Sequence, residues 1–300
     1  MTSVLVLLFV AASAADYAGP DVCAKCHPAE AEAQAQSAHA RAIARSKPPQ
    51  PGGWAFGAGH QAITFVTRLD AEHYLEEGRT WYRRSNAYGR TPGAASDAGR
   101  KYRIFDPDAG ILRCFSCHST GPLSQAADGA IEIHEPGVRC EACHGPSAAH
   151  ANDPARYRPF HPGRLPAGQL NNFCGQCHRM PAGAAETPDL RNPWNARHQP
   201  LLLSASKCFL GSKGKLSCLT CHSPHQPLVT DLAAYDAKCS SCHAAPRHTA
   251  RVAGRPCAGC HMPTVKPEPN LEFANHRIAI FAPGDPLTPI AKPSGRAAAR

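Results

Sequence analysis

The most regular hydrophobic pattern of the chain lies between residues 55 and 85. Apolar and polar side chains alternate from Ala55 to Leu69 and again from His73 to Ser85, as they do in strands with one buried face. Glu77-Gly78 is an expected turn inside the second run, and Gly89 to Gly99 an expected loop. The pattern predicts a β-hairpin or a small sheet within residues 54–105.

The rest of the chain predicts helices, and most of them must be short. Pro28 to Ser46 is rich in Ala, Glu and Gln and begins with Pro, which favours a helix there. Between Cys114 and His261 closely spaced cysteine motifs leave room for short helices alone. A proline-rich connector is expected between His144 and Cys174, and residues 283–300 have the composition of a disordered tail.

The N-terminus carries an apolar run of a different kind. Val4 to Val10 is followed by small residues, and Ala12-x-Ala14 is typical of signal-peptidase cleavage near residues 14–16. The run is too short for a bilayer, which takes about 20 apolar residues. We therefore expect residues 1–15 to be a cleaved signal peptide, no transmembrane segment after cleavage, and a periplasmic or otherwise extracytoplasmic location.

Composition adds the observation that decides the chemistry. The 300 residues include 15 Cys and 17 His, far more Cys than an ordinary cytosolic enzyme holds. There is no glycine period, no sustained heptad and no second long apolar run, which excludes collagen, coiled coils and multi-pass membrane proteins.

Fourteen of the cysteines belong to seven copies of Cys-x-x-Cys-His, the attachment signature of c-type haem. The two thiols add to the two vinyl groups of the porphyrin, and the following His binds the iron from below. The thiols that would hold the seven haems c are Cys23 and Cys26, Cys114 and Cys117, Cys140 and Cys143, Cys174 and Cys177, Cys218 and Cys221, Cys239 and Cys242, and Cys257 and Cys260. The proximal iron ligands are His27, His118, His144, His178, His222, His243 and His261.

Three alternatives use paired cysteines as well, namely zinc half-sites, redox dithiols and a disulfide scaffold. None of them requires His directly after the second Cys, whereas His follows in every copy here. Cys208 is the fifteenth cysteine, and either a buried thiol or a bridge between chains accounts for it.

Ten further histidines exceed the seven needed to close every iron with a second imidazole. Methionine is a poor source of sixth ligands, because Met180 and Met262 stand too close to their own proximal His to reach the other face of the ring. The same argument applies to His225 and His248, which follow a proximal His by three and five residues. Each of them, if it is a ligand, must bind a neighbouring haem.

With these motifs and histidines the chain resembles exported multihaem cytochromes. They are related to the nitrifiers' tetrahaem cytochrome, the pentahaem nitrite reductases and the hydroxylamine oxidoreductases. The greatest likeness is to cytochrome modules often fused to tetratricopeptide repeats. Five stretches carry the resemblance: Cys23 to His27 with Ser37-Ala-His39-Ala; Gly57-Ala-Gly-His60 with Thr80-Trp-Tyr82; Gly137 to Pro146 with His150; His198 with Ser206-Lys-Cys208-Phe and Cys218 to His225; and Cys257 to Pro263 with Asn275-His276-Arg-Ile.

The resemblance implies a multihaem cytochrome c fold, with short α-helices and irregular chain wrapped around stacked haems. It implies a heptahaem domain over residues 16–282 with a haem-free, β-rich insertion at 54–105. The distal ligands that it suggests are His39, His60, His150, His198, His225, His248 and His276, with His73, His134 and His161 as substitutes. The nitrite reductases mark their catalytic haem with Cys-x-x-Cys-Lys, and this chain has no such motif.

These features favour an electron carrier that passes single electrons between closely packed, mostly bis-His, low-spin haems. Its expected partners are redox proteins, either other cytochromes or quinol-linked membrane complexes. The alternatives are an enzyme that acts on a small nitrogen or sulfur compound at one open haem, and a subunit of a haem filament. The oligomeric state stays open.

The net charge does not indicate nucleic acid as a partner. The chain alone carries a formal +9. Fourteen propionates and one net positive charge per ferric haem bring this value to roughly +2 when oxidised and roughly −5 when reduced.

We predict that the haem-free chain does not fold. Roughly 41 residues per haem are too few to build a separate apolar core around each cofactor, so the haems themselves must fill the interior. Circular dichroism of the haem-free chain should show no cooperative thermal transition. A sharp, cooperative melt would contradict this prediction.

Overall fold

The computed structural model describes residues 13–46, 53–71, 73–94, 101–105, 110–179, 189, 191–244, 248 and 254–290, with the backbone alone for 101–105. The expected signal sequence lies outside these residues except for its end, where Ala14–Asp16 forms a 3-10 turn, η1. The chain divides into two compact units. One contains residues 1–80 and 93–161, and the other contains residues 81–92 and 162–300.

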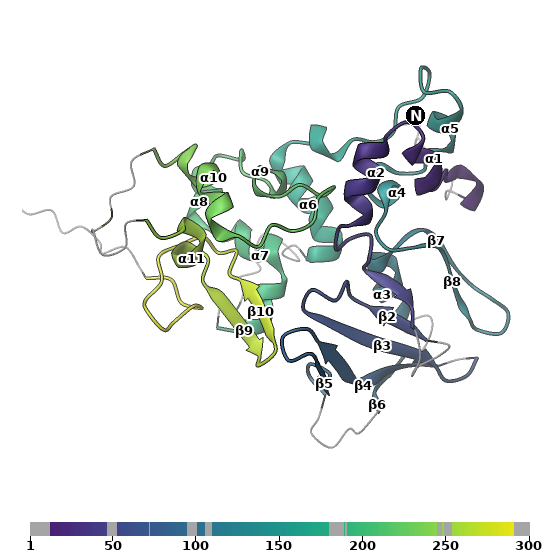
Figure 1. Ribbon diagram of the computed structural model, residues 1–300, viewed down its shortest axis with the longest axis horizontal. Helices are drawn as coiled ribbons and strands as arrows, with labels where there is room; N and C mark the ends of the chain where they lie inside the picture. Colours follow the sequence, from purple (N-terminus) through teal and green to yellow (C-terminus); the bar gives the residue numbers. More distant parts are fainter. Residues whose placement is uncertain are drawn as a thin grey trace, which may run out of the picture. The chain divides into compact units, whose positions relative to one another are not determined.

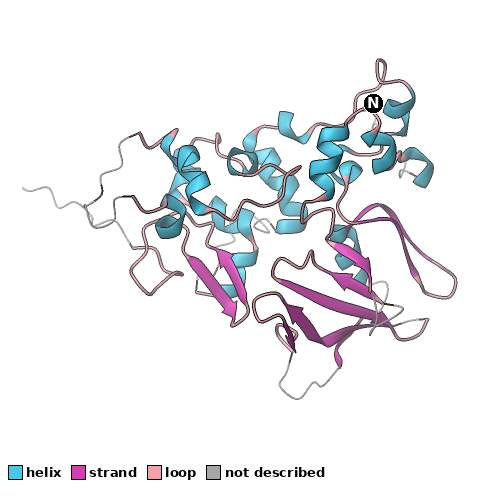
Figure 2. Cartoon of the chain, in the orientation of Figure 1, coloured by secondary structure: helices cyan, strands magenta, loops and turns pink. Residues whose placement is uncertain are grey.

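An antiparallel sheet lies mainly in the first unit, although residues 81–90 of its strands are counted with the second (Figures 1 and 2). Its strands follow the order β1-β2-β3-β4-β5, and β6 also pairs with β4. The strands are β1 (Ile43–Arg45), β2 (Trp54–Phe56), β3 (Ala62–Arg68), β4 (Tyr74–Tyr82), β5 (Ala87–Arg90) and β6 (Lys101–Phe105). The alternation in the sequence therefore correctly predicted a small sheet within residues 54–105.

The core of this unit brings the sheet against the second cysteine motif. Helix α3 (Leu112–His118) carries Phe115, which is fully buried. The Phe115 ring meets the ring of Trp54 edge-on at 5.5 Å and that of Phe56 at 5.1 Å between centroids. Because Phe115 lies between the two cysteines of its motif, this packing fixes where the sheet holds that motif.

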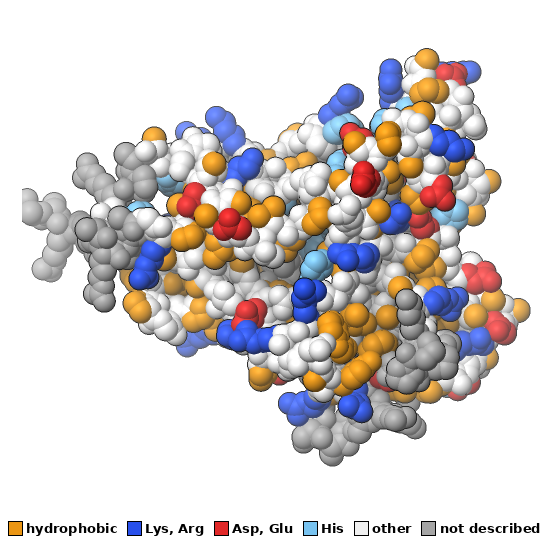
Figure 3. All heavy atoms as spheres, viewed as in Figure 1, with side chains coloured by type: hydrophobic (Ala, Val, Ile, Leu, Met, Phe, Trp, Pro, Cys, Tyr) orange, Lys and Arg blue, Asp and Glu red, His pale blue; other side chains and the backbone are white. Residues whose placement is uncertain are grey.

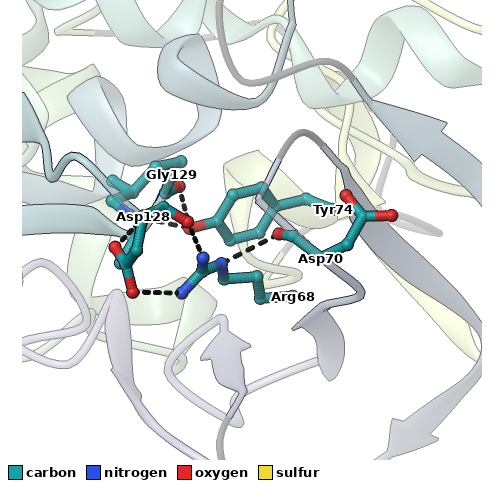
Figure 4. Close-up of polar contacts among 7 residues, drawn as sticks. Arg68, Asp70, Tyr74, Asp128 and Gly129 are labelled. Carbon is teal, nitrogen blue, oxygen red and sulfur yellow. Dashed lines mark hydrogen bonds and ion pairs between the residues drawn. The ribbon is translucent and has the colours of Figure 1, made fainter.

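A hairpin of β7 (Ser119–Gln125) and β8 (Ile131–Pro136) follows α3 directly, and the sequence pattern did not predict it. The Tyr74 hydroxyl donates to the carbonyl oxygen of Gly129 at 3.2 Å and accepts from the amide of Ile131 at 2.7 Å. The Arg68 guanidinium donates hydrogen bonds to the carboxylate and to the backbone carbonyl oxygen of Asp128 (Figure 4). These bonds tie the turn of the hairpin to strands β3 and β4.

The remaining helices of the first unit are short. They are α1 (Pro20–Ala24), α2 (Pro28–Ala35), α4 (Cys140–His144) and α5 (Ala148–Asn152). Two of these helices carry cysteine motifs, since α1 contains Cys23 of the first motif and α4 begins at Cys140 of the third.

The second unit consists of short helices and one β-ribbon. Its elements are η3 (Pro162–Arg164), α6 (Ala167–His178), η4 (Pro193–Arg197), α7 (Gln199–Ser204), α8 (Lys207–Gly211), α9 (Cys218–Cys221), η5 (Leu232–Tyr235), α10 (Asp236–Ser240), α11 (Cys257–His261), β9 (Thr264–Glu268) and β10 (Leu271–Ala274). Its apolar core is small: Leu201, Leu202 and Val265 are nearly inaccessible. Helix α7 contacts α6, α8 and η4, and η4 contacts both strands of the ribbon.

Three local predictions are wrong. The helix expected to continue to Ser46 ends at Ala35, because the buried Ser37 hydroxyl accepts from the Ala40 amide and the chain turns into β1. Glu77-Gly78 is not a turn, since β4 runs through it and pairs Glu77 with Lys101. The expected loop from Gly89 begins later, because Gly89 and Arg90 are the end of β5.

The tail expected to be disordered begins with residues that carry defined contacts. The Ile290 amide donates to the Ile280 carbonyl at 2.8 Å, and the Asn275 side chain donates to the Pro286 carbonyl at 2.8 Å. Residues 291–300 lie outside the described part of the chain. Among the helices that are described, none has the length and apolarity to cross a bilayer.

We predict that Tyr74→Phe lowers the free energy of unfolding of the haem-loaded protein by about 1–3 kcal/mol, because the buried Ile131 amide loses its acceptor. Urea unfolding measures the difference. Tyr157→Phe is the matched control, since that side chain is exposed and should unfold at the wild-type midpoint. Equal midpoints for the two variants would show that the hairpin does not depend on this bond.

Candidate haem sites

Each of the seven motifs lies on a single helical turn. The turns belong to α1, α3, α4, α6, α9, α10 and α11. Three motifs fall only partly inside a named helix. In each of them a backbone hydrogen bond from the His amide to the carbonyl oxygen of the first Cys closes the turn. These bonds run from His27 to Cys23 at 2.9 Å, from His222 to Cys218 at 3.0 Å and from His243 to Cys239 at 3.0 Å. Residues i, i+3 and i+4 share one helical face, so both thiols and the imidazole of a motif face the same way.

The motif thiols lie at the protein surface. Cys26, Cys177, Cys242 and Cys260 are exposed, and the other ten are partly exposed. Free cysteine is ordinarily among the most buried residue types. Thiols held in pairs at the surface fit a bulky group that attaches to them and covers them, as a porphyrin does. Figure 3 shows histidine side chains, in pale blue, reaching the surface as well.

The proximal imidazoles are oriented as iron ligands need to be. Nδ1 of His118 donates to the Ala42 carbonyl oxygen at 2.9 Å, and Nδ1 of His261 donates to that of Ala279 at 2.8 Å. His144 makes the same bond to Phe160 at 2.9 Å. A carbonyl can only accept, so the proton sits on Nδ1 and the Nε2 lone pair stays available for a metal.

His144, His222 and His261 each lie close to a second histidine ring. The centroids of His144 and His161 are 6.0 Å apart, those of His222 and His276 6.2 Å, and those of His261 and His248 6.1 Å. Because a metal–imidazole bond is about 2 Å long, two imidazoles on opposite sides of one metal ion have ring centres about 6 Å apart. The three pairs therefore have the separation that bis-His ligation requires.

The charge state of one pair fits the same chemistry. Desolvation lowers the pKa of His276 to about 4, although the side chain keeps some contact with solvent. Burial also lowers the pKa of His222. Both rings are thus held neutral, which is the form that binds a metal.

The other predicted distal ligands are placed as follows. Nε2 of His60 lies 3.2 Å from Nη2 of Arg41, and Nδ1 of His150 donates to the Tyr157 carbonyl at 2.9 Å. His39 precedes β1, His198 links η4 to α7, and His225 follows the fifth motif in a turn.

The substitutes named from the sequence have different surroundings. His73 is bonded to the Asp70 carboxylate at 2.8 Å, and the His134 ring lies against Tyr17 at 5.1 Å between centroids. Among the ligands expected from the sequence, His161 is only a substitute. Its place in a proline-rich connector, 17 residues after His144, offered no helical spacing that would have singled it out.

First cysteines of different motifs touch one another. Side-chain hydrogen bonds join Cys23 to Cys140, Cys174 to Cys218 and Cys239 to Cys257. The bond from the Cys218 thiol lowers the pKa of Cys174 and raises that of Cys218. Desolvation, aided by the neighbouring thiol, raises the pKa of Cys23 to about 11.

Cys208 is neither fully buried nor remote from the motifs. Desolvation raises its pKa, and so does the nearby Cys242. It also contributes to the raised pKa of Cys221. Across the described residues, no three His, Cys, Asp or Glu side chains form a cluster that would hold a bare metal ion.

Comparisons with known proteins find similar cytochromes. The family model for cytochrome c554 and c-prime matches residues 76–145, which include the second and third motifs. The multiheme cytochrome MtrA of Shewanella baltica (strain OS185) is 26% identical over 175 residues, a match that covers 51% of this chain and 46% of that protein. The chain thus spans a little under half the length of this curated relative.

Two solved structures are similar as well. The crystal structure of the outer cell wall cytochrome OcwA matches with a TM-score of 0.56 at 16% identity, over 88% of this chain and 79% of that one. The undecaheme cytochrome from the S-layer of Carboxydothermus ferrireducens has a TM-score of 0.47 at 18% identity, over 80% of this chain and 44% of that one. Residues 76–145 thus match a cytochrome c family model, and the chain shares with OcwA a fold of helices and small antiparallel sheets.

Proposed function

We propose that this protein is an exported electron-transfer cytochrome with seven covalent haems c and mainly bis-His iron. The observation that carries the proposal is the set of three imidazole pairs at 6.0–6.2 Å. A second imidazole closes the sixth coordination position, which leaves no open site for a substrate. A haem with two imidazole ligands supplies reversible one-electron chemistry at low potential.

The chain's own residues would hold and orient the cofactors. The fourteen motif cysteines provide the covalent attachment, and the seven motif histidines provide the proximal nitrogens. The bonds from Nδ1 of His118, His144 and His261 to backbone carbonyls fix the tautomer and the ring direction. Backbone carbonyls also raise the basicity of these imidazoles, which favours the oxidised iron.

The ring pairs support an assignment of three sixth ligands. His161 would complete the iron site of His144, His276 that of His222, and His248 that of His261. For the sites of His27, His118, His178 and His243 the candidates from the sequence are His39, His60, His150, His198 and His225. His248 follows His243 by five residues, yet its ring lies close to that of His261. This placement is expected of a residue that binds the iron of a neighbouring haem rather than that of its own motif.

Export and partners belong to the same proposal. Residues 1–15 would direct the chain across the membrane, and residues 16–282 would form the haem-binding part. An extracytoplasmic location agrees with covalent haem attachment. The partners would be other redox proteins, such as cytochromes or quinol-linked membrane complexes.

Spectroscopy of the haem-loaded protein tests the proposal. The pyridine haemochrome count should be seven, and the ferric protein should show low-spin signals alone in paramagnetic resonance. Carbon monoxide should leave the reduced spectrum unchanged, because imidazoles occupy the sixth positions. A high-spin signal together with carbon monoxide binding would instead identify an enzyme with an open haem.

A substitution tests the ligand assignment at the His144 iron. We predict that His161→Met keeps seven haems but raises the potential of one of them, because a thioether replaces an imidazole. Redox titration and the near-infrared band of thioether ligation report the change. His73→Met is the control, because His73 is bonded to Asp70 and should leave every potential unchanged. An unaltered titration of His161→Met would refute the assignment.

A further inference from the structure

The helices that carry successive motifs of the second unit lie against one another in twos. Helix α6, with the fourth motif, contacts α9, with the fifth, and α10, with the sixth, contacts α11, with the seventh (Figure 1). In both cases the first cysteines of the two motifs are hydrogen-bonded, Cys174 with Cys218 and Cys239 with Cys257. At each contact a polar side chain that is neither a cysteine nor a histidine of the motifs bonds to the neighbouring helix.

Asn171 joins α6 to α9. Its side chain is 3% exposed, and Oδ1 accepts from the Cys218 amide at 3.0 Å and from the Cys218 thiol at 3.2 Å. Nδ2 donates to the Leu216 carbonyl at 3.3 Å. The Cys218 amide is at the first turn of α9, where no carbonyl of the helix can accept from it. Asn171 therefore supplies the acceptor that the first turn of the partner helix lacks.

Asp236 joins α10 to α11 in the same manner. Its Oδ1 accepts from the Cys257 amide at 2.8 Å, and a side-chain bond from the Cys257 thiol is present as well. The Cys257 amide again belongs to the first turn of its helix. A carboxylate that accepts from an orphan amide makes a charge-assisted bond, which is stronger than a neutral one.

The two residues occupy equivalent positions in the sequence. Asn171 stands three residues before Cys174, and Asp236 stands three residues before Cys239, so each shares a helical face with the first cysteine of its own motif. The other five motifs have side chains without an acceptor oxygen at that position, namely Pro20, Ile111, Gly137, Lys215 and Gly254. The acceptor thus occurs only in the first motif of each pair.

From this repetition we infer that Asn171 and Asp236 are positioning residues that clamp two haem-attachment helices together, so that haems four and five and haems six and seven form contacting pairs. The inference rests on the proposed function, since it takes the motifs to carry haem. Thioether formation consumes the thiol proton, which moves to the vinyl carbon as the C–S bond forms. The bond from the backbone amide survives that step and keeps the two sulfurs, and the haem edges attached to them, together.

The first unit holds a third pair by a different route. Glu141 lies inside the third motif and is 4% exposed. Its carboxylate accepts from Ala18 at 2.9 Å, Gly19 at 2.8 Å and Ser147 at 2.8 Å. Ala18 and Gly19 lead into α1, which carries Cys23, so Glu141 holds the first motif against its own. Haems one and three would be the contacting pair there.

Soret circular dichroism of the haem-loaded protein tests the clamp, because haems in contact give a bisignate couplet that separated haems lack. Asn171→Leu removes the acceptor but keeps the branched shape of the side chain, and it should lose part of the couplet at a full haem count. Asp236→Leu added to it should remove a further part. Asn171→Asp keeps the oxygen, as the other pair does naturally, and Asn172→Leu changes an exposed neighbour on α6. Both should retain the full couplet.

The outcomes separate this inference from the proposed function. A couplet of unchanged amplitude in the haem-replete Asn171→Leu protein would overturn the clamp and leave the electron-transfer role intact. If Asn171→Leu fails to mature, the milder Asn171→Ser and Asp236→Ser variants, whose shorter side chains cannot span to the partner amide, must show the loss instead. Absence of covalent haem from the wild-type chain would overturn the proposed function itself.

Discussion

A porphyrin attached through two sulfurs and one imidazole demands that all three groups leave the chain on the same side within five residues. A single helical turn meets this demand, because positions i, i+3 and i+4 share a face. The seven motifs occupy such turns, and five of the seven helices that carry them are no longer than the motif itself. The thiols stay at the surface of the chain. The apolar side chains that would fill the interior of an ordinary protein are correspondingly few.

Backbone carbonyl oxygens far away in the sequence orient two of the motif histidines. Ala42 precedes the second motif by more than 70 residues, and Ala279 follows the seventh by 18, yet their carbonyls fix Nδ1 of His118 and His261. The sheet of the first unit serves this purpose, since β1 begins directly after Ala42 and Phe115 packs onto the same strands. The chain that leads into the sheet thus helps to orient the imidazole of the second motif.

Side-chain hydrogen bonds also determine which motif helices contact one another. A side-chain oxygen on one motif helix accepts from an amide at the start of the next motif helix, so an amide that has no acceptor within its own helix links the two helices. Such links explain why the buried polar residues Asn171 and Glu141 are tolerated in so small a core. The contact between the His222 and His276 rings joins segments that lie 54 residues apart in the chain.

The sequence alone determined which residues could attach haem. Cys-x-x-Cys-His is a local pattern, so no tertiary contact is needed to recognise it. It also indicated the small sheet, because alternation is a local property of each strand. Tertiary structure decided the rest. Ser37 and Gly78 lie where local propensity points to a helix and to a turn, but packing ends the helix early and carries the strand through the glycine. His161 faces His144, and Asn171 reaches Cys218, only because the chain returns on itself between them. The spacing of residues fixes neighbours within a turn or a strand, whereas ligands on opposite faces of a ring come from segments that only folding brings together.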